Sequence, residues 1–210
     1  MNFQEFLHRV PALRQLEIDG WEAQFRLAPK MQKKYSDSYL AKKDPRLAAV
    51  LALFYPDENA ETTFLLTERA QYNGTHSAQI SFPGGKMDAN DPNLEHTALR
   101  EAQEEVSADR SAIEIVRPIT EVYIPPSNFL VTPFIGFMDS RPHFVQNEEV
   151  ASLIEVSLKT ILGDAAIKEV PITTSYAKNV KVPCFYLNDH VVWGATAMML
   201  SEIRTLLLNC

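Results

Sequence analysis

The sequence predicts a single α/β domain in which strands dominate and helices lie in the middle and at both ends. The chain has 210 residues, 46% of them hydrophobic, which is enough for one sizeable core. Short apolar runs rich in β-branched and aromatic residues recur between polar turns, as strands do. We expect one domain over 1–210, made of an N-terminal helix and arm (1–44), a core (45–165) and a C-terminal hairpin and helix (166–210).

The N-terminal part should be helical and then irregular. Residues 2–16 space their apolar side chains as a helix does, but Pro11 predicts a break or two short pieces. Residues 20–44 are mixed and polar, and we expect an arm laid over the main domain. The runs 46–56 and 62–70 flank a polar loop and predict two strands.

A short strand and a central helix follow. Residues 79–85 predict a strand that ends in Gly84-Gly85. Asp91 is a good N-cap, and proline, here Pro92, is favoured at the first helical position, so we expect a helix from there to about Val106.

The rest of the chain predicts further strands and a last helix. The expected elements are strands at 113–124, 128–138 and 151–158, a short helix after the third of these, a hairpin of 181–187 and 190–194 that turns at Asn188-Asp189, and an amphipathic helix at 196–208.

Composition narrows the possible functions. The formal charge of −7 argues against a protein that binds duplex nucleic acid, but not against one that binds a small phosphorylated ligand. Cys184 and Cys210 match no metal-ligand spacing. We find neither a secretory signal nor a run near the ~20 apolar residues of a membrane span, so we expect no membrane partner and a cytoplasmic location.

Three carboxylates crowd one side of the central helix. At ~100° per residue, Glu101, Glu104 and Glu105 fall within an arc of roughly 100°. Like charges at i,i+4 repel each other, and they lie near the helix C-terminus, where the macrodipole disfavours them. A hard divalent cation would reverse both effects, because Mg²⁺ takes oxygen ligands. A solvated acidic face is the alternative.

The segment before the helix favours the metal site. Gly84-Gly85 ends a strand and allows the backbone to approach a ligand closely. The following loop carries Asp88 and Asp91, and Arg100 can pair with a loop carboxylate and hold the loop to the helix.

These residues resemble the Nudix hydrolase motif, in which a glycine, a glutamate and Arg-Glu-apolar-x-Glu-Glu-x-Gly stand at fixed spacing. Gly85 begins the motif here, and residues 100–105 (REAQEE) carry its core. The distance from glycine to arginine is one residue longer, with Asp91 near the usual glutamate. Ser107 replaces the closing glycine.

The longer loop is similar to that of one subfamily, the coenzyme A pyrophosphatases. LLTERA (65–70), HSAQ (76–79) and FPGG (82–85) resemble its upstream signature, and WGATA (193–197) resembles its last strand-to-helix junction. Gly74 and Ala78 replace an arginine and a glycine of that signature. The resemblance covers about residues 45–205.

The resemblance implies an α/β/α sandwich with a mixed sheet, an N-terminal helical arm and a C-terminal helix. It implies metal-dependent hydrolysis of coenzyme A or its thioesters to adenosine 3′,5′-bisphosphate and 4′-phosphopantetheine or its acyl form, and a homodimer. Mg²⁺ or Mn²⁺ would be held by Glu101 and Glu105, with Glu104 as a third ligand, and would help to generate a hydroxide nucleophile. Glu148 or Glu149 would supply a further ligand or the general base.

Other residues would position the loop or the substrate. By the resemblance, Arg100 and Asp91 are structural, the Gly84-Gly85 backbone lies against the substrate, and Arg69, His76 and Gln79 contact it. An exposed arginine and a packed histidine are the alternatives for Arg69 and His76. Because Gly74 replaces an arginine, a phosphate contact would shift to Lys86 or Arg69.

Two other functions stay open at this point. One is a pyrophosphatase for ADP-ribose or another nucleoside diphosphate derivative. The other is a Nudix-like module that senses a nucleotide without turnover, against which the three intact glutamates argue.

Overall fold

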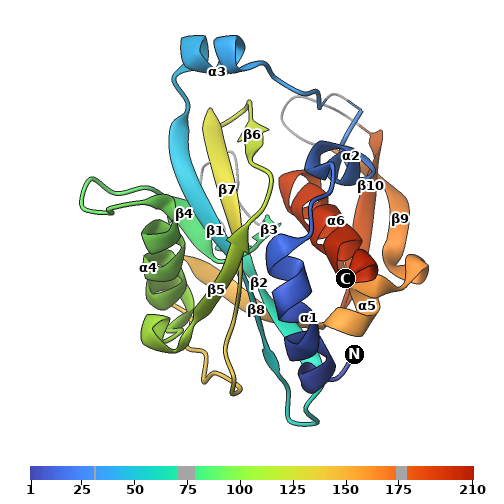
Figure 1. Ribbon diagram of the computed structural model, residues 1–210. Helices are drawn as coiled ribbons and strands as arrows, with labels where there is room; N and C mark the ends of the chain where they lie inside the picture. Colours follow the sequence, from blue (N-terminus) through green and yellow to red (C-terminus); the bar gives the residue numbers. More distant parts are fainter. Residues whose placement is uncertain (31, 71–78, 174–178) are drawn as a thin grey trace.

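The fold is built on a mixed sheet, seen in the computed structural model, which describes residues 1–30, 32–70, 79–173 and 179–210 (Figure 1). Within these residues the sheet has eight strands: β1 (Arg46–Pro56), β2 (Thr62–Arg69), β3 (Ile80–Ser81), β4 (Gly84–Lys86), β5 (Glu114–Pro118), β6 (Val122–Ile124), β7 (Phe129–Phe137) and β8 (Val150–Ser157). The order along it is β3-β2-β1-β7-β5, with β4 on β1, β6 on β7 and β8 on β2. β1 and β7 run parallel, and the other pairings described are antiparallel.

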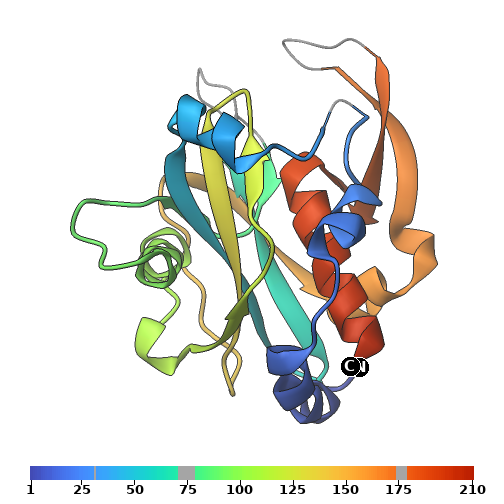
Figure 2. The same cartoon turned by 45° about the horizontal axis from the view of Figure 1, so that its top comes forward.

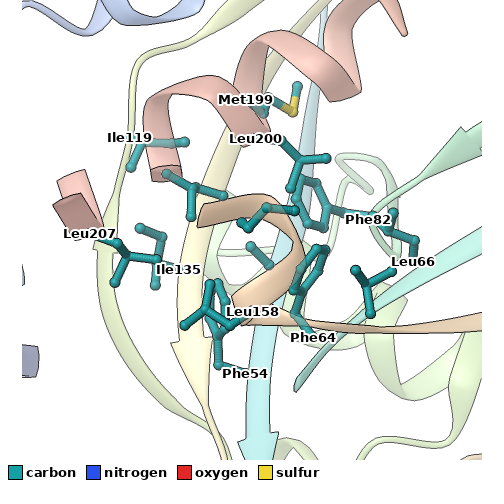
Figure 3. Packing of buried hydrophobic residues seen from close by; sticks show 14 of the residues in the cluster. Phe54, Phe64, Leu66, Phe82, Ile119, Ile135, Leu158, Met199, Leu200 and Leu207 are labelled. Carbon is teal, nitrogen blue, oxygen red and sulfur yellow. The ribbon is translucent and has the colours of Figure 1, made fainter. Parts of the chain in front are cut away.

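Helices cover both faces of this sheet, so the predicted α/β/α sandwich is confirmed. Helix α4 (Leu94–Val106) lies on one face, and α1 (Phe3–Gln15) and α6 (Gly194–Asn209) lie on the other (Figure 1). The alternation of β1 supplies both layers: its odd-numbered residues from Ala49 to Tyr55 pack with α4, and Ala48, Ala52 and Phe54 pack in the opposite core. Figure 3 shows that opposite core, where Phe82 and Phe64 lie below Leu200 of α6 and Phe54 lies beside Leu158.

Helix α1 is continuous, so the predicted break at Pro11 was wrong. Its first turn is closed by a capping box in which Asn2 accepts from the N–H of Glu5 and the Glu5 side chain accepts from the N–H of Asn2. Phe3, Phe6, Val10 and Leu13 are buried, and Pro11 lies on the exposed side. Packing of that apolar face therefore outweighs the one backbone donor that proline lacks.

The predicted arm contains two short helices, α2 (Gly20–Phe25) and α3 (Asp37–Lys43). Helix α2 is tied to α6, because the hydroxyl of Ser201 donates to Ala23 O at 2.6 Å. Helix α3 caps the end of the sheet at which β1 begins and β6 ends (Figure 1).

The C-terminal part forms a second sheet, β11-β10-β9. The predicted hairpin is confirmed as β10 (Val180–Leu187) and β11 (His190–Trp193), with φ of 47° at Asn188 and 65° at Asp189 as its turn requires. The sequence prediction missed β9 (Ile167–Ile172), an edge strand whose residues are mostly exposed. The short helix after β8 is α5 (Leu158–Leu162), and single turns of 3₁₀ helix lie at η1 (Arg110–Ala112) and η2 (Asp164–Ala166).

Two predicted strands are divided. The run 79–85 gives β3 and β4, so the glycine pair begins β4 instead of ending one strand as predicted. The run 113–124 gives β5 and β6, between which Ile119 N–H donates to Pro133 O. In the described ranges, no helix combines the length and apolar character that crossing a membrane requires.

Candidate active site

Helix α4 starts later than predicted. Its N-cap is Asn93, whose Oδ1 accepts from the N–H of His96 at 2.8 Å, so the assignment of Asp91 as N-cap was wrong. Asn93 occupies the cap because Asp91 is buried and bonded elsewhere. The helix ends at Ser107, which replaces the motif glycine and adopts the left-handed conformation with φ of 57°.

Arg100 joins the loop before α4 to the helix. Its Nε lies 3.0 Å from Asp91 Oδ1 and its Nη2 lies 2.9 Å from Asp91 Oδ2, a two-pronged contact. Nη2 also donates to the carbonyl of Lys86, at the end of β4. The Arg100 guanidinium holds the pKa of Asp91 well below its usual range, with further hydrogen bonds from the N–H of Asp88 and from Thr97. The arginine thus fixes β4, the loop and the helix to one another, as an arginine paired with a loop carboxylate should.

The three glutamates differ in burial and contacts. Glu105 is 5% exposed, and its Oε2 accepts from the N–H of Gly84 at 3.0 Å. Glu101 is partly buried and lies 3.0 Å from Arg100 Nη1. Glu104 is exposed and also pairs with Arg100, at 2.9 Å. Two of the three carboxylates therefore face the glycine pair, and the third lies on the outer side.

Both glycines of the pair make close contacts. A Cβ on Gly85 would lie 2.5 Å from Glu101 Oε1, so the carboxylate occupies the space that a side chain would need. A Cβ on Gly84 would lie 2.3 Å from the carbonyl oxygen of Ala49 on β1, and Gly84 has a φ of 154°. Gly84 therefore allows β4 to pair closely with β1, whereas a side chain at position 85 would displace the Glu101 carboxylate.

Glu149 reaches the same region from the start of β8. Its carbonyl accepts from Ala70 N–H at 2.8 Å, and its Oε2 lies 3.1 Å from Arg69 Nη2. Glu148 is exposed and makes no side-chain hydrogen bond with the residues that the structure describes. Gln79 accepts from the N–H of Arg69 through its carbonyl at 3.0 Å. His76 lies outside the described residues.

The carboxylates raise one another's pKa. Burial is the main cause of a pKa of about 7 for Glu105, which the charges of Glu101 and Glu149 also raise, against the hydrogen bond from Gly84 and the charge of Arg69. Burial likewise raises the pKa of Glu101, opposed by Arg100 and assisted by Glu104 and Glu149. The charge of Glu149 therefore influences the carboxylates of Glu101 and Glu105 on α4.

The donor set suits a hard divalent cation. Among the described residues, no three acidic, histidine or cysteine side chains form a ready-made cage. Mg²⁺, however, commonly binds one or two carboxylates and completes its shell with water and substrate phosphate. Glu101 and Glu105 lie one turn apart and face the same backbone, which fits that mode of binding.

Sequence reasoning missed two residues that support the site. Thr97 donates to Asp91 Oδ2 at 2.9 Å, and the His96 ring lies 3.1 Å from Asp91 Oδ1. Both lie in the first turn of α4, where polar residues are common, so only the later position of the N-cap would have indicated them.

Comparison with known protein families identifies the family to which this chain belongs. The family model described as NUDIX domain matches residues 45–167. The chain belongs to the Nudix hydrolase family. It is 33% identical, over 144 residues, to a protein of Yersinia pestis (strain Pestoides F) with the name Uncharacterized Nudix hydrolase NudL, which covers 68% of this chain and 71% of the relative. A protein of Yersinia pseudotuberculosis serotype O:1b with the same name matches equally.

Solved Nudix structures share the fold. RenU, a Nudix hydrolase from M. smegmatis, has a TM-score of 0.55 at 19% identity and covers 79% of this chain and 87% of its own. A MutT/nudix family protein from Enterococcus faecalis has a TM-score of 0.50 at 16% identity, over 100% of this chain and 74% of its own. The protein is accordingly a Nudix pyrophosphohydrolase that acts on nucleoside diphosphate derivatives, in a family that uses divalent metals such as Mg²⁺ or Mn²⁺.

Proposed function

We propose that this Nudix enzyme hydrolyses the diphosphate bond of coenzyme A or its thioesters. The observation that carries the proposal is the Asp91–Arg100 pair. The loop that is one residue longer than the general Nudix motif resembles that of the coenzyme A pyrophosphatases, and this pair holds the loop to α4. The upstream LLTER segment supports the same substrate, because it ends in Arg69, beside Glu149.

Glu101 and Glu105 are the proposed metal ligands, and Glu104 is the third. When bound, Mg²⁺ or Mn²⁺ neutralises phosphate charge and acidifies a bound water. The chain's own contribution is to aim the two inner carboxylates at β4, since Gly84 N–H holds Glu105 and Gly85 leaves room for Glu101. Arg100 keeps Glu104 at the same edge.

Arg69 and Glu149 have separate proposed tasks. Arg69 would bind a phosphate oxygen of the substrate, which requires it to exchange its contact with Glu149. Glu149, once released, would accept a proton from the attacking water. The water oxygen then bonds to one phosphorus, and the bridging oxygen leaves with the other phosphate, giving adenosine 3′,5′-bisphosphate and 4′-phosphopantetheine. We prefer Glu149 to Glu148 for this role because the charge of Glu149 raises the pKa of both Glu101 and Glu105.

A substrate panel tests the proposal. With Mg²⁺ present, kcat/KM is measured for coenzyme A, dephospho-coenzyme A, ADP-ribose and NADH. We expect coenzyme A to have the highest value. A preference for ADP-ribose would reject coenzyme A as the substrate but would not contradict hydrolysis of a diphosphate bond. Gly74, which replaces the arginine of the subfamily signature, favours that outcome.

We also propose that residues 1–210 act as one domain and that two copies form a homodimer. One hydrophobic core joins α1, the main sheet and α6, which supports a single unit. Sedimentation equilibrium at micromolar concentration measures the mass, and a value near 23.7 kDa would contradict the dimer.

A further inference from the structure

The first observation is a local reversal of charge. Residues 30–46 contain six lysine and arginine residues and two aspartates, a net charge of +4 in a chain whose formal charge is −7. This segment spans α3 and the first residue of β1. An anionic ligand that approaches an otherwise acidic protein would be drawn to this place.

The second observation is a row of cations across β4 and β1. Lys86 pairs with Ala48, and Arg46 is two residues before Ala48, so the side chains of Lys86 and Arg46 lie on the same face of the sheet. Diagonal neighbours of this kind lie ~7 Å apart, within reach of long side chains. Both residues are exposed.

The third observation is that Arg46 is held in place. Its guanidinium lies 4.1 Å from the ring centroid of Phe129, its partner on β7, and its Nη2 donates to Ser127 O at 2.7 Å. Stacking and one hydrogen bond leave other donors of the guanidinium for a ligand.

Helix α3 is fixed over the same edge. Asn128 Nδ2 donates to the carbonyl of Lys43 at 3.1 Å, and Asn128 Oδ1 accepts from the hydroxyl of Tyr123 at 2.8 Å. Tyr39 of α3 packs against Tyr123, and Lys43 Nζ lies 5.7 Å from the centroid of the Tyr39 ring. The lysines at the end of α3 therefore belong to a built surface rather than to an isolated helix.

This surface meets the catalytic region at the edge of the sheet: the Lys86 carbonyl accepts from Arg100, while the Lys86 side chain lies on the face opposite α4. Ala49 pairs with Gly85, so Arg46 lies three residues away along β1, roughly 10 Å from the glycine pair. We call Lys42, Lys43, Arg46 and Lys86 the basic edge. The figures show α3 and the start of β1 at one end of the sheet, above β4 (Figures 1 and 2).

We propose that the basic edge is the subsite for a phosphate monoester on the nucleoside half of the substrate. This inference rests on the proposed function, and it supplies the phosphate contact that Gly74 cannot make. A dianionic phosphate matches the arginine fork and neighbouring ammonium groups. Four cations on a chain of negative net charge fit one small anion better than a nucleic-acid backbone.

A paired set of double variants tests the subsite. K43Q/K86Q removes two charges of the basic edge, and K33Q/K34Q removes two charges from the same arm, where the lysines lie over Tyr35 and Trp21. We expect K43Q/K86Q to lower kcat/KM for coenzyme A by about tenfold or more and for dephospho-coenzyme A by less than about twofold. We expect K33Q/K34Q to change the ratio of the two values by less than about twofold. Equal losses for both substrates, or equal effects of both variants, would overturn the subsite.

Product inhibition separates this inference from the substrate assignment. Inhibition constants of adenosine 3′,5′-bisphosphate and AMP are measured against whichever diphosphate the wild type hydrolyses best. We expect the bisphosphate to bind more tightly than AMP to the wild type, and this advantage to disappear in K43Q/K86Q. If coenzyme A is not a substrate but the advantage is present and lost in the variant, the proposed substrate fails and the subsite stands. If the two nucleotides bind equally to the wild type, the subsite is wrong whatever the substrate.

Discussion

Glu105 combines burial with a hydrogen bond that does not depend on its charge. Replacement by glutamine keeps the acceptor for Gly84 N–H and removes the negative charge. We expect E105Q to fold as the wild type does and to lose Mg²⁺-dependent hydrolysis by at least about a hundredfold, since a ligand charge is missing. Circular dichroism and steady-state turnover check this. E95Q, on the exposed first turn of the same helix, is the matched control, and near-wild-type turnover by E105Q would reject the metal assignment.

The neighbouring acids of the β8 loop can be separated in the same way. We expect E149Q to lower kcat by about 10²–10⁴-fold, the usual contribution of a general base. We expect E148Q to stay within about twofold of the wild type. If E148Q were the slower variant, the assignments would have to be exchanged.

At the scale of residues, the sequence indicates which segment carries the candidate site better than it indicates which of two adjacent residues acts there. Residues 100–105 could be selected because spacing alone places three carboxylates on one arc of a helix. The sequence offers no choice between Glu148 and Glu149, because the contact that distinguishes them is tertiary: Ala70 N–H donates to Glu149 O and holds the start of β8 against the end of β2.

Among the elements, β4 shows how two adjacent glycines have different tasks. G84A would press a Cβ against a backbone carbonyl, which cannot move without displacing β1, whereas G85A would meet the mobile end of Glu101. We expect G84A to lower the free energy of unfolding by about 2 kcal/mol or more and G85A to lower it by less than about 1 kcal/mol while weakening Mn²⁺ binding. Urea denaturation and Mn²⁺ titration check the pair. Equal loss of stability in G84A and G85A would contradict the different roles proposed for the two glycines.

The ion pair between Asp91 and Arg100 should make the free energy of unfolding depend on pH. The pKa of Asp91 is lower in the folded protein than the ~3.9 of an unfolded chain, so the unfolded chain takes up the proton first as pH falls. The stabilisation is therefore complete above about pH 4 and is lost below it. We expect D91N to be about 2 kcal/mol less stable than the wild type at pH 7, with a difference that shrinks as pH falls below 4. If the difference in stability between D91N and the wild type stayed constant from pH 7 to pH 3, the ionised Asp91 carboxylate would not be its cause.

Element boundaries failed where tertiary contacts overruled local preference. Asp91-Pro92 is a good helix start by local rules, but Arg100 and Thr97 take the Asp91 carboxylate and Asn93 caps the helix instead. Pro11 is a helix breaker by the same rules, yet the buried face of α1 keeps the helix continuous. The hairpin at Asn188-Asp189 was predicted correctly because its turn chemistry is local.

For the whole molecule, the sequence predicted a mixed α/β fold but not its pairing. The long strands carry apolar runs that are visible in the sequence, whereas β9 is an exposed edge strand and carries no such run. The parallel pairing of β1 with β7 joins distant parts of the chain, and no local pattern encodes it.

Removal of the metal should affect activity without unfolding the protein. The described core is apolar, and Glu105 and Glu101 have protein partners of their own. We expect EDTA to abolish turnover and to leave a cooperative thermal transition. Added Mg²⁺ should raise the stability with the logarithm of its concentration, by ~2.7 kcal/mol at 100 times Kd. Scanning calorimetry measures this, and unfolding by EDTA alone at 25 °C would contradict it.

The parallel pairing also bears on how the chain folds. The carboxylate motif on α4 lies in the chain between β1 and β7, and the floor on which α4 packs includes both strands. Closing so long a connection is slow, because the entropy is lost before the strand contacts form. During synthesis, a nascent chain that ends before Phe137 therefore carries every carboxylate of α4 but lacks part of the sheet that presents them. Helix α4 gains its complete support only after translation has passed β7.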